Sequence, residues 1–237
     1  MDKILGMVQG LTEFLPVSSS GHLVFLSQAL NINVAGVHQI ALLHLGTFLA
    51  VFLFSFRVLR RIFHNLKVLI NLIISTIPAA LAGVLFEEKI DAFFSRLEFL
   101  PAFFSITAVV LSLTKNLDGK KCLTNMTWGD ALLVGLAQAL AILPGVSRSG
   151  VTVSTLLFLG LKRSDAVQYS FLMSLPVILG AGLLSLKEVS FAPSPFLLSF
   201  SFGLVALMWL ARSVKSGDFW KFSYYCLFMA VVSYFVG

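Results

Sequence analysis

Long, nearly uncharged apolar segments fill most of this chain and limit what it can fold into. After a first segment that begins at residue 4, they lie at 38–56, 66–86, 99–114, 128–143, 166–186, 195–211 and 219–236. About 20 apolar residues let an α-helix cross a bilayer. Charged residues make up 12% of the chain, against roughly a quarter in soluble proteins. Because the segments lack the alternation of a membrane β-barrel, the sequence predicts an all-α, polytopic membrane protein.

Two short polar motifs interrupt the apolar sequence and share a pattern. The first is Glu13-Phe-Leu-Pro-Val-Ser-Ser-Ser-Gly-His22, and the second is Leu143-Pro-Gly-Val-Ser-Arg-Ser-Gly150. Both read Leu-Pro, an optional Gly, Val-Ser, one variable residue, and Ser-Gly. We interpret them as internal copies. They divide a single membrane domain, 1–237, into a first repeat of about 1–99 and a second repeat of about 115–237.

Each motif should break the helix that carries it. Pro16 and Pro144 remove a backbone donor and clash with the preceding turn, and the Ser and Gly residues that follow are poor helix formers. A broken helix at membrane depth is tolerated only where it is buried in protein or lines a wet cavity. We therefore expect six full transmembrane helices plus two re-entrant helical hairpins, 4–30 and 128–160, whose tips meet near the middle of the bilayer.

The basic residues predict an orientation for this topology. One side of the membrane would receive Arg57, Arg60, Arg61, Lys67, Lys115, Lys120, Lys121, Lys162, Arg163, Arg212, Lys215 and Lys221, and the other only Lys3, Lys89, Arg96 and Lys187. Since basic loops favour the cytoplasmic side, both termini should lie outside. The three spans between the motifs make the repeats inverted, an arrangement that places sites near the midplane. No basic run with interleaved aromatics indicates nucleic-acid binding.

Glu13 and Arg148 are the ionisable residues of the motifs. Gln9 and Glu13 are spaced i, i+4, so both side chains lie on one helical face. A charged group within the membrane costs at least about 2.5 kcal/mol and is by default a functional hypothesis. The guanidinium of Arg148 can grip phosphate oxygens with two parallel hydrogen bonds. A purely structural Glu13–Arg148 ion pair is the alternative, and such pairing would not exclude catalysis.

The serines and glycines of the motifs are candidate anion-binding groups. Where a helix restarts after a break, its free N–H groups and its dipole favour an anion, although serines in membrane helices often only bond a carbonyl one turn back. The substrate-binding candidates are Gln9, Ser18, Ser20, Gly21, Gly145, Ser147, Ser149 and Gly150. His22 can act as base, acid or nucleophile near neutral pH, unless it is a satisfied structural residue. We interpret His38, His44 and His64 as structural or solvated.

At these residues the chain resembles the undecaprenyl-diphosphate phosphatases of the BacA type, bacterial membrane enzymes associated with bacitracin resistance. The first signature is Gln9-Gly-Leu-Thr-Glu13-Phe-Leu-Pro-Val-Ser-Ser-Ser-Gly-His22, and the second is Pro144-Gly-Val-Ser-Arg-Ser-Gly150. Similarity continues through Ile77-Pro-Ala-Ala-Leu-Ala-Gly83 and Ser170-Phe-Leu-Met-Ser-Leu-Pro176, and so covers nearly the whole chain. The resemblance implies hydrolysis of undecaprenyl diphosphate to undecaprenyl phosphate in the bacterial plasma membrane, which recycles the lipid carrier for peptidoglycan synthesis.

The resemblance also implies that Glu13, Ser19, His22 and Arg148 form the reaction centre. Gln9 stands where the family's first signature often carries Glu, which removes one carboxylate. The residues themselves leave the nucleophile open between Ser19, His22 and water. A Mg²⁺ or Ca²⁺ ion could be held by Glu13 together with substrate phosphates, whereas no zinc-type ligand cluster is present.

The expected partners are a polyprenyl diphosphate lipid and the surrounding membrane lipids; the oligomeric state is not predicted. A lipid-phosphate flippase is the main alternative function, because inverted repeats with broken helices are also how secondary transporters are built. Translocation would need the Arg148 clamp but no nucleophile or base. A purely structural membrane subunit would leave a buried Glu13 and Arg148 unexplained.

Overall fold

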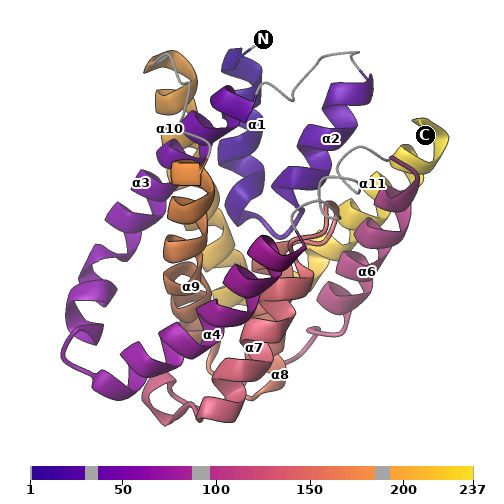
Figure 1. The fold of residues 1–237 in the computed structure, drawn as a ribbon. Coiled ribbons are helices and arrows are strands. Elements are labelled where there is room, and N and C mark those ends of the chain that lie inside the picture. Colours follow the sequence, from indigo (N-terminus) through magenta and orange to yellow (C-terminus); the bar gives the residue numbers. More distant parts are fainter. Residues whose placement is uncertain (1, 30–36, 87–96, 185–192, 237) are drawn as a thin grey trace.

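The chain folds into a bundle of helices (Figure 1). The structure is a computed structural model that describes residues 2–29, 37–86, 97–184 and 193–236. The helices are α1 (Asp2–Phe14), α2 (Ser19–Ala29), α3 (Val37–Ile62), α4 (Leu66–Leu85), α6 (Leu100–Ser112), α7 (Trp128–Leu140), α8 (Arg148–Phe158), α9 (Arg163–Leu184), α10 (Pro193–Ser216) and α11 (Phe222–Val236), with short 3₁₀ turns η1 (Leu97–Phe99), η2 (Leu123–Asn125) and η4 (Phe219–Lys221). The described residues form no β-strand, which confirms the all-α prediction.

Five helical segments of the described chain are long and apolar enough to cross a membrane. They are Ala41–Ile62, Leu66–Leu85, Arg163–Leu183, Pro193–Ser216 and Phe219–Val236.

The expected sixth span, 99–114, is not among these five segments. It corresponds to Leu97–Ser112, which belongs to the apolar helices of 10–17 residues. Pro101 lies in the first turn of α6, and the helix ends before Leu113. The described residues therefore support a multi-pass membrane protein with five helices of spanning length.

Both motifs lie between helices, as their composition predicts. The first motif turns between α1 and α2, and the second between α7 and α8. Ser18 and Gly145 adopt left-handed backbone conformations, with φ of 65° and 100°, which reverse the chain within a few residues. In Figure 1 the α1–α2 pair points inward from the end that holds both termini, and the α7–α8 pair points inward from the opposite end.

Close helix packing holds these motif-bearing helices in place. Helix α1 packs against α10, and α7 packs against α4. A Cβ atom added to Gly10 would lie 2.6 Å from the carbonyl oxygen of Ser199, and one added to Gly135 would lie 2.7 Å from that of Ser75. Glycine at these positions lets the backbones approach, as small residues commonly do in membrane helix pairs. Helices α3 and α9 also pack together, as do α6 and α11.

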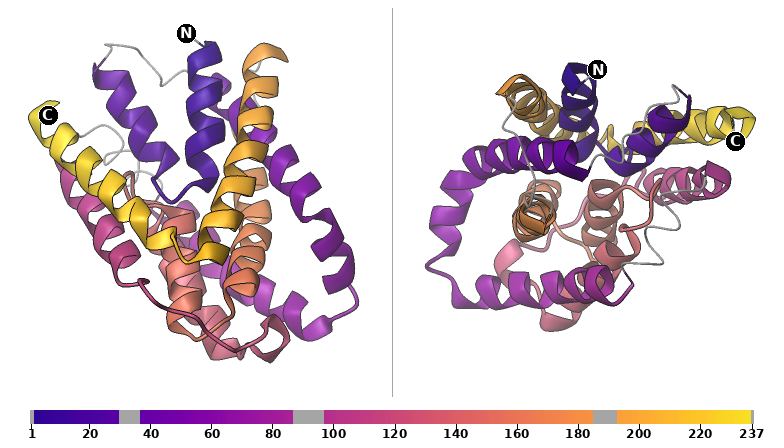
Figure 2. Two further views of the ribbon diagram at one scale, coloured as in Figure 1. Left: turned by 180° about the vertical axis from the view of Figure 1, so that it is seen from behind. Right: turned by 45° about the horizontal axis from the view of Figure 1, so that its top comes forward.

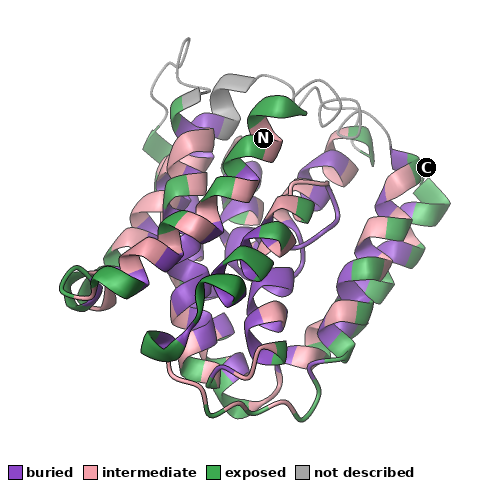
Figure 3. Ribbon diagram, turned by 60° about the horizontal axis from the view of Figure 1, so that its bottom comes forward, coloured by how far each residue is buried: buried purple, intermediate pink, exposed green. Residues whose placement is uncertain are grey.

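Buried residues lie inside the bundle, and its exterior is apolar. Figure 3 shows buried residues along the inner faces of the helices and exposed residues along the outer faces. Large apolar side chains are exposed on the outer faces, among them Leu53, Leu136 and Phe228, as expected where lipid replaces water.

The loops that carry many of the basic residues gather toward the end opposite the two termini (Figures 1 and 2). Arg163 Nε donates to the Leu117 carbonyl at 3.0 Å, and Lys115 Nζ lies 4.7 Å from the centre of the Trp220 ring. Lys89, Arg96 and Lys187, which we assigned to the other side, lie outside the described residues.

Candidate active site

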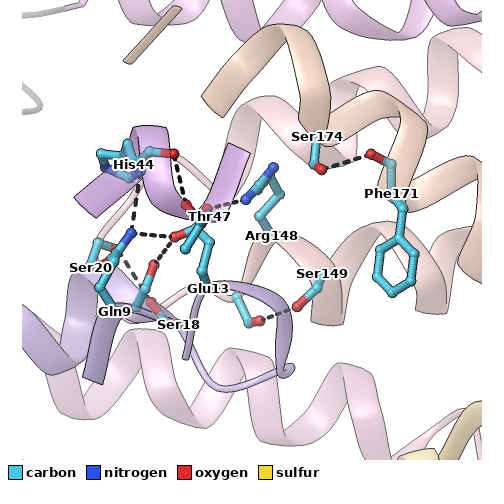
Figure 4. Close-up of polar contacts among 12 residues, drawn as sticks. Gln9, Glu13, Ser18, Ser20, His44, Thr47, Arg148, Ser149, Phe171 and Ser174 are labelled. Atoms are coloured by element: carbon cyan, nitrogen blue, oxygen red, sulfur yellow. Dashed lines mark hydrogen bonds and ion pairs between the residues drawn. The ribbon is translucent and has the colours of Figure 1, made fainter. Parts of the chain in front are cut away.

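The tips of the two motifs touch each other (Figure 4). Ser18 Oγ accepts a hydrogen bond from the Gly145 backbone N–H at 2.9 Å. Ser149 Oγ donates to the Leu15 carbonyl at 3.0 Å. A Cβ atom on Gly21 would lie 2.9 Å from Gly145 Cα, so the two backbones are in van der Waals contact. The structure therefore brings together segments more than a hundred residues apart in the chain, as the sequence motifs predict.

The copied residues of the two motifs make matching hydrogen bonds. Ser18 precedes α2 and accepts from the Gly21 N–H at 3.3 Å, and Ser147 precedes α8 and accepts from the Gly150 N–H at 3.1 Å. Such hydroxyls satisfy the free N–H groups at the start of a helix. Ser18 Oγ also lies 3.3 Å from Ser20 Oγ, and Ser147 Oγ lies 3.3 Å from Ser149 Oγ. The sequence repeat is thus a structural repeat at the tips.

Glu13 joins the polar side chains of the first motif to Arg148 of the second. Its Oε2 atom accepts hydrogen bonds from Ser19 Oγ at 2.6 Å and from Gln9 Nε2 at 2.9 Å. Its Oε1 atom accepts from Arg148 Nη2 and forms an ion pair with that guanidinium. The carboxylate is buried, where a charge requires an opposite charge and hydrogen bonds to be stable. Four of the predicted site residues therefore form one cluster.

Arg148 also has an unused donor that faces a small cavity. Its Nη1 atom is buried and has no hydrogen-bond partner. The cavity, of about 10 Å³, is lined by Glu13, Phe14, Arg148, Ser149, Ser170, Phe171 and Ser174. That is roughly the room for one water molecule. Because buried polar groups are nearly always paired, this guanidinium nitrogen is available to a water molecule or to one oxygen of a bound anion.

His22 lies apart from the Glu13 cluster and makes its hydrogen bonds elsewhere. Its Nδ1 atom is 2.7 Å from the Ser18 carbonyl oxygen, and its Nε2 atom is 2.7 Å from Tyr225 Oη. The ring stacks on Tyr225 and meets Phe104 edge-on. Both ring nitrogens thus have hydrogen-bond partners, and the ring packs against side chains of α6 and α11. Within the described chain no contact links this ring to the carboxylate or guanidinium of the cluster.

Comparison with known proteins identifies the family. A family model described as bacitracin resistance protein BacA matches residues 3–232. The chain belongs to the BacA family.

Its relatives in this family include three proteins named undecaprenyl-diphosphatase. The protein from Thermotoga petrophila is 54% identical over 238 residues, which cover 100% of both chains. The protein from Thermosipho melanesiensis is 45% identical, over 100% of this chain and 99% of the relative. The protein from Methanococcus maripaludis strain C7 is 45% identical, over 98% of this chain and 97% of the relative. The family assignment made from the two motifs is therefore confirmed.

Three residues outside the BacA signature motifs contact the site and were missed. His44, interpreted from sequence as structural or solvated, places Nδ1 at 3.2 Å from Gln9 Nε2. Thr107 Oγ1 donates to the Gly145 carbonyl at 2.9 Å, and Tyr225 holds His22. For His44, the sequence offers only a weak similarity between Ala41-Leu-Leu-His-Leu-Gly46 and Phe171-Leu-Met-Ser-Leu-Pro176. His64 is exposed, as expected, and the side chain of His38 lies outside the described residues.

Proposed function

We propose that this protein hydrolyses undecaprenyl diphosphate to undecaprenyl phosphate and inorganic phosphate, and so returns the lipid carrier to peptidoglycan synthesis. Membership of the BacA family and relatives named undecaprenyl-diphosphatase support this activity. The observation that carries it is the arrangement of Glu13, which accepts the Ser19 hydroxyl on one oxygen and pairs with Arg148 through the other. A hydroxyl, a base and an anion clamp thus meet at one point.

The contacts favour Ser19 as the nucleophile. As its Oγ attacks the terminal phosphorus, Glu13 takes the hydroxyl proton, the phosphorus–oxygen bond to the lipid phosphate breaks, and undecaprenyl phosphate leaves. Glu13 releases this proton to solvent. Water then attacks the phosphoserine and gives a proton to Glu13, which passes it to Ser19 Oγ as the bond between phosphorus and Ser19 breaks and hydrogen phosphate leaves. The free Nη1 of Arg148 would donate to an oxygen of the terminal phosphate, and stabilisation of the transferring phosphoryl group should contribute most to the rate.

His22 fits this scheme less directly than Glu13. Its two ring nitrogens are bonded to Ser18 and Tyr225, so it would have to exchange a partner before it could accept the Ser19 proton. We keep it in the proposed reaction centre as a residue whose ring supports the tip that carries Ser19.

In this proposal, a divalent ion would be bound mainly by the phosphates of the substrate. The described residues gather no group of three or more His, Cys, Asp or Glu side chains, and both oxygens of Glu13 are engaged. These residues therefore do not fit a preformed site for Mg²⁺ or Ca²⁺, and no step above passes through such an ion.

We also propose that the two broken helix pairs are re-entrant hairpins within inverted repeats, in the bacterial plasma membrane with both termini outside. In the two proposed repeats α1 corresponds to α7 and α4 corresponds to α10, so the α1–α10 pair corresponds to the α7–α4 pair. This correspondence supports the arrangement. Impermeant thiol reagents applied to intact cells should then label a cysteine at Lys3 but not one at Asp218. The reverse labelling pattern would contradict the proposed orientation.

Phosphate release tests the proposed activity. Purified wild-type protein in detergent, given a long-chain polyprenyl diphosphate, should release one phosphate per lipid, and Glu13→Gln should lower the rate by about 10²-fold or more. Folded wild-type protein that releases no phosphate, with or without Mg²⁺ or Ca²⁺, would contradict hydrolysis. Transport of the lipid phosphate without its hydrolysis would then be the better account.

A further inference from the structure

His44 contacts the reaction centre from α3 and has no role in the function proposed so far. Its Nδ1 atom lies 3.2 Å from Gln9 Nε2, and the same amide nitrogen lies 2.9 Å from Glu13 Oε2. The ring is also within electrostatic range of Glu13 and Arg148. Figure 4 shows the Gln9 amide between the imidazole and the carboxylate.

The two contacts of the amide determine which atoms donate. A carboxylate oxygen only accepts, so Gln9 must direct one N–H at Glu13. The second N–H of the same nitrogen then points at His44 Nδ1, which must be the unprotonated ring nitrogen. In the flipped amide, the Gln9 oxygen would face a carboxylate oxygen, an arrangement of two acceptors.

This orientation has a visible cost. Gln9 Oε1 is buried and has no hydrogen-bond partner, and the whole side chain is inaccessible to solvent. A buried, unsatisfied acceptor is normally unfavourable. The amide keeps this orientation because its two donor contacts, to Glu13 and to His44, outweigh the unsatisfied oxygen. Removal of the His44 acceptor would leave the second N–H unsatisfied as well.

We propose that His44 is a positioning residue for Glu13. With Nδ1 as acceptor, it fixes the Gln9 amide, and the amide in turn holds the Glu13 carboxylate in the orientation that accepts the Ser19 proton. The inference rests on the proposed phosphatase activity. His44 does not line the cavity beside Arg148, so its loss should change kcat more than KM.

Two substitutions separate this role from a role in packing. Asn at position 44 can place its amide oxygen near the position of Nδ1, whereas Gln places its polar atoms near that of Nε2. We expect His44→Leu to lower kcat about 10-fold or more, with KM changed less than about 3-fold. We expect His44→Asn to recover most of that loss and His44→Gln to recover little of it.

Thr47→Val is the matched control. Thr47 lies about one turn further along α3 and is buried, and its hydroxyl bonds only to carbonyls of its own helix, those of Leu43 and His44. This variant should keep the wild-type kcat. Melting temperatures in detergent, measured for every variant, show which ones fold.

The outcomes are distinct. If His44→Leu keeps the wild-type kcat, or if the Asn and Gln variants lose the same activity, His44 does not position Glu13. If His44→Leu fails to fold, the comparison of Asn with Gln decides. Wild-type protein without phosphatase activity would instead contradict the proposed function.

Discussion

Ser19 and Glu13 illustrate how single residues of this protein acquire function from their neighbours. The hydroxyl lies 2.6 Å from the carboxylate, and the carboxylate is held by a guanidinium from the other motif. The sequence motifs predicted these members of the site because each motif is short and local. The sequence could not predict His44, Thr107 or Tyr225, because their contacts join residues 35, 38 and 203 positions apart. Such contacts depend on how the helices are packed.

Substitution of Ser19 by Ala tests the nucleophile. Because Ala has no hydroxyl to attack phosphorus, we expect kcat for phosphate release to fall by about 10²-fold or more. Ser27→Ala in the same helix is the control, since the Ser27 hydroxyl bonds only to the Val24 carbonyl at 2.8 Å, and it should keep full activity. Wild-type kcat in Ser19→Ala would mean that Ser19 is not the nucleophile and that water or His22 attacks the substrate.

At the scale of the helix, the breaks were the predictable part of the fold. Pro16 and Pro144 placed both breaks correctly, because a proline acts on its own backbone. The segment 99–114, which we expected to span the membrane, is not among the five helices of spanning length. The close contact between the two tips needs Gly21 and Gly145, whose role in packing is not readable from either motif alone.

Gly21→Ala should separate the tips. The added Cβ would meet Gly145 Cα and N at 2.9 Å and Phe104 Cζ at 2.8 Å, so the backbone must shift and Glu13 would lose its alignment with Arg148. We expect phosphate release to fall by at least about 10-fold while the protein still folds. Gly83→Ala within α4, where no atom lies within 4 Å of the new Cβ, should keep activity and stabilise its helix by about 0.5–1 kcal/mol. Equal effects of the two substitutions would exclude tip separation as the cause.

The start of α7 provides a prediction about pH. Thr127 and Asp130 cap this helix reciprocally, and Asp130 also forms an ion pair with Lys121. Burial raises the pKa of Asp130, but hydrogen bonds from Lys121 and Thr127 outweigh it and hold the pKa below that of an ordinary aspartate. A lowered carboxyl pKa adds stability above the pKa of the unfolded state, and this stability is lost as the pH falls through the folded pKa.

Asp130→Asn should therefore lower the free energy of unfolding at neutral pH by about 1 kcal/mol. The difference from wild type should shrink as the pH drops through the acidic range in which Asp130 becomes protonated. Thermal melting in detergent between neutral and acidic pH measures both effects. A difference that stays constant over this range would show that the charge of Asp130 does not stabilise the fold.

For the whole molecule, the two motifs contribute different chemical groups to one cluster. The tips share their serine caps, yet the first supplies Glu13 and Ser19 and the second supplies Arg148. A site of this kind requires both motifs, because neither motif alone has an acid, a hydroxyl and a cation. The family explains why the motifs occur together, and the packing of α1 on α10 and of α7 on α4 explains how they meet.

A double-mutant cycle on Glu13 and Arg148 tests this account most directly. The values of kcat/KM for phosphate release would be measured for wild type, Glu13→Gln, Arg148→Lys and the double variant. Lys keeps the charge of Arg148 but not its planar fork. If the two motifs form one reaction centre, each single variant should lose most of the activity and the double variant little more, since residues that act as a unit are strongly non-additive. Losses that simply multiply would show that the two motifs act independently and would contradict the account.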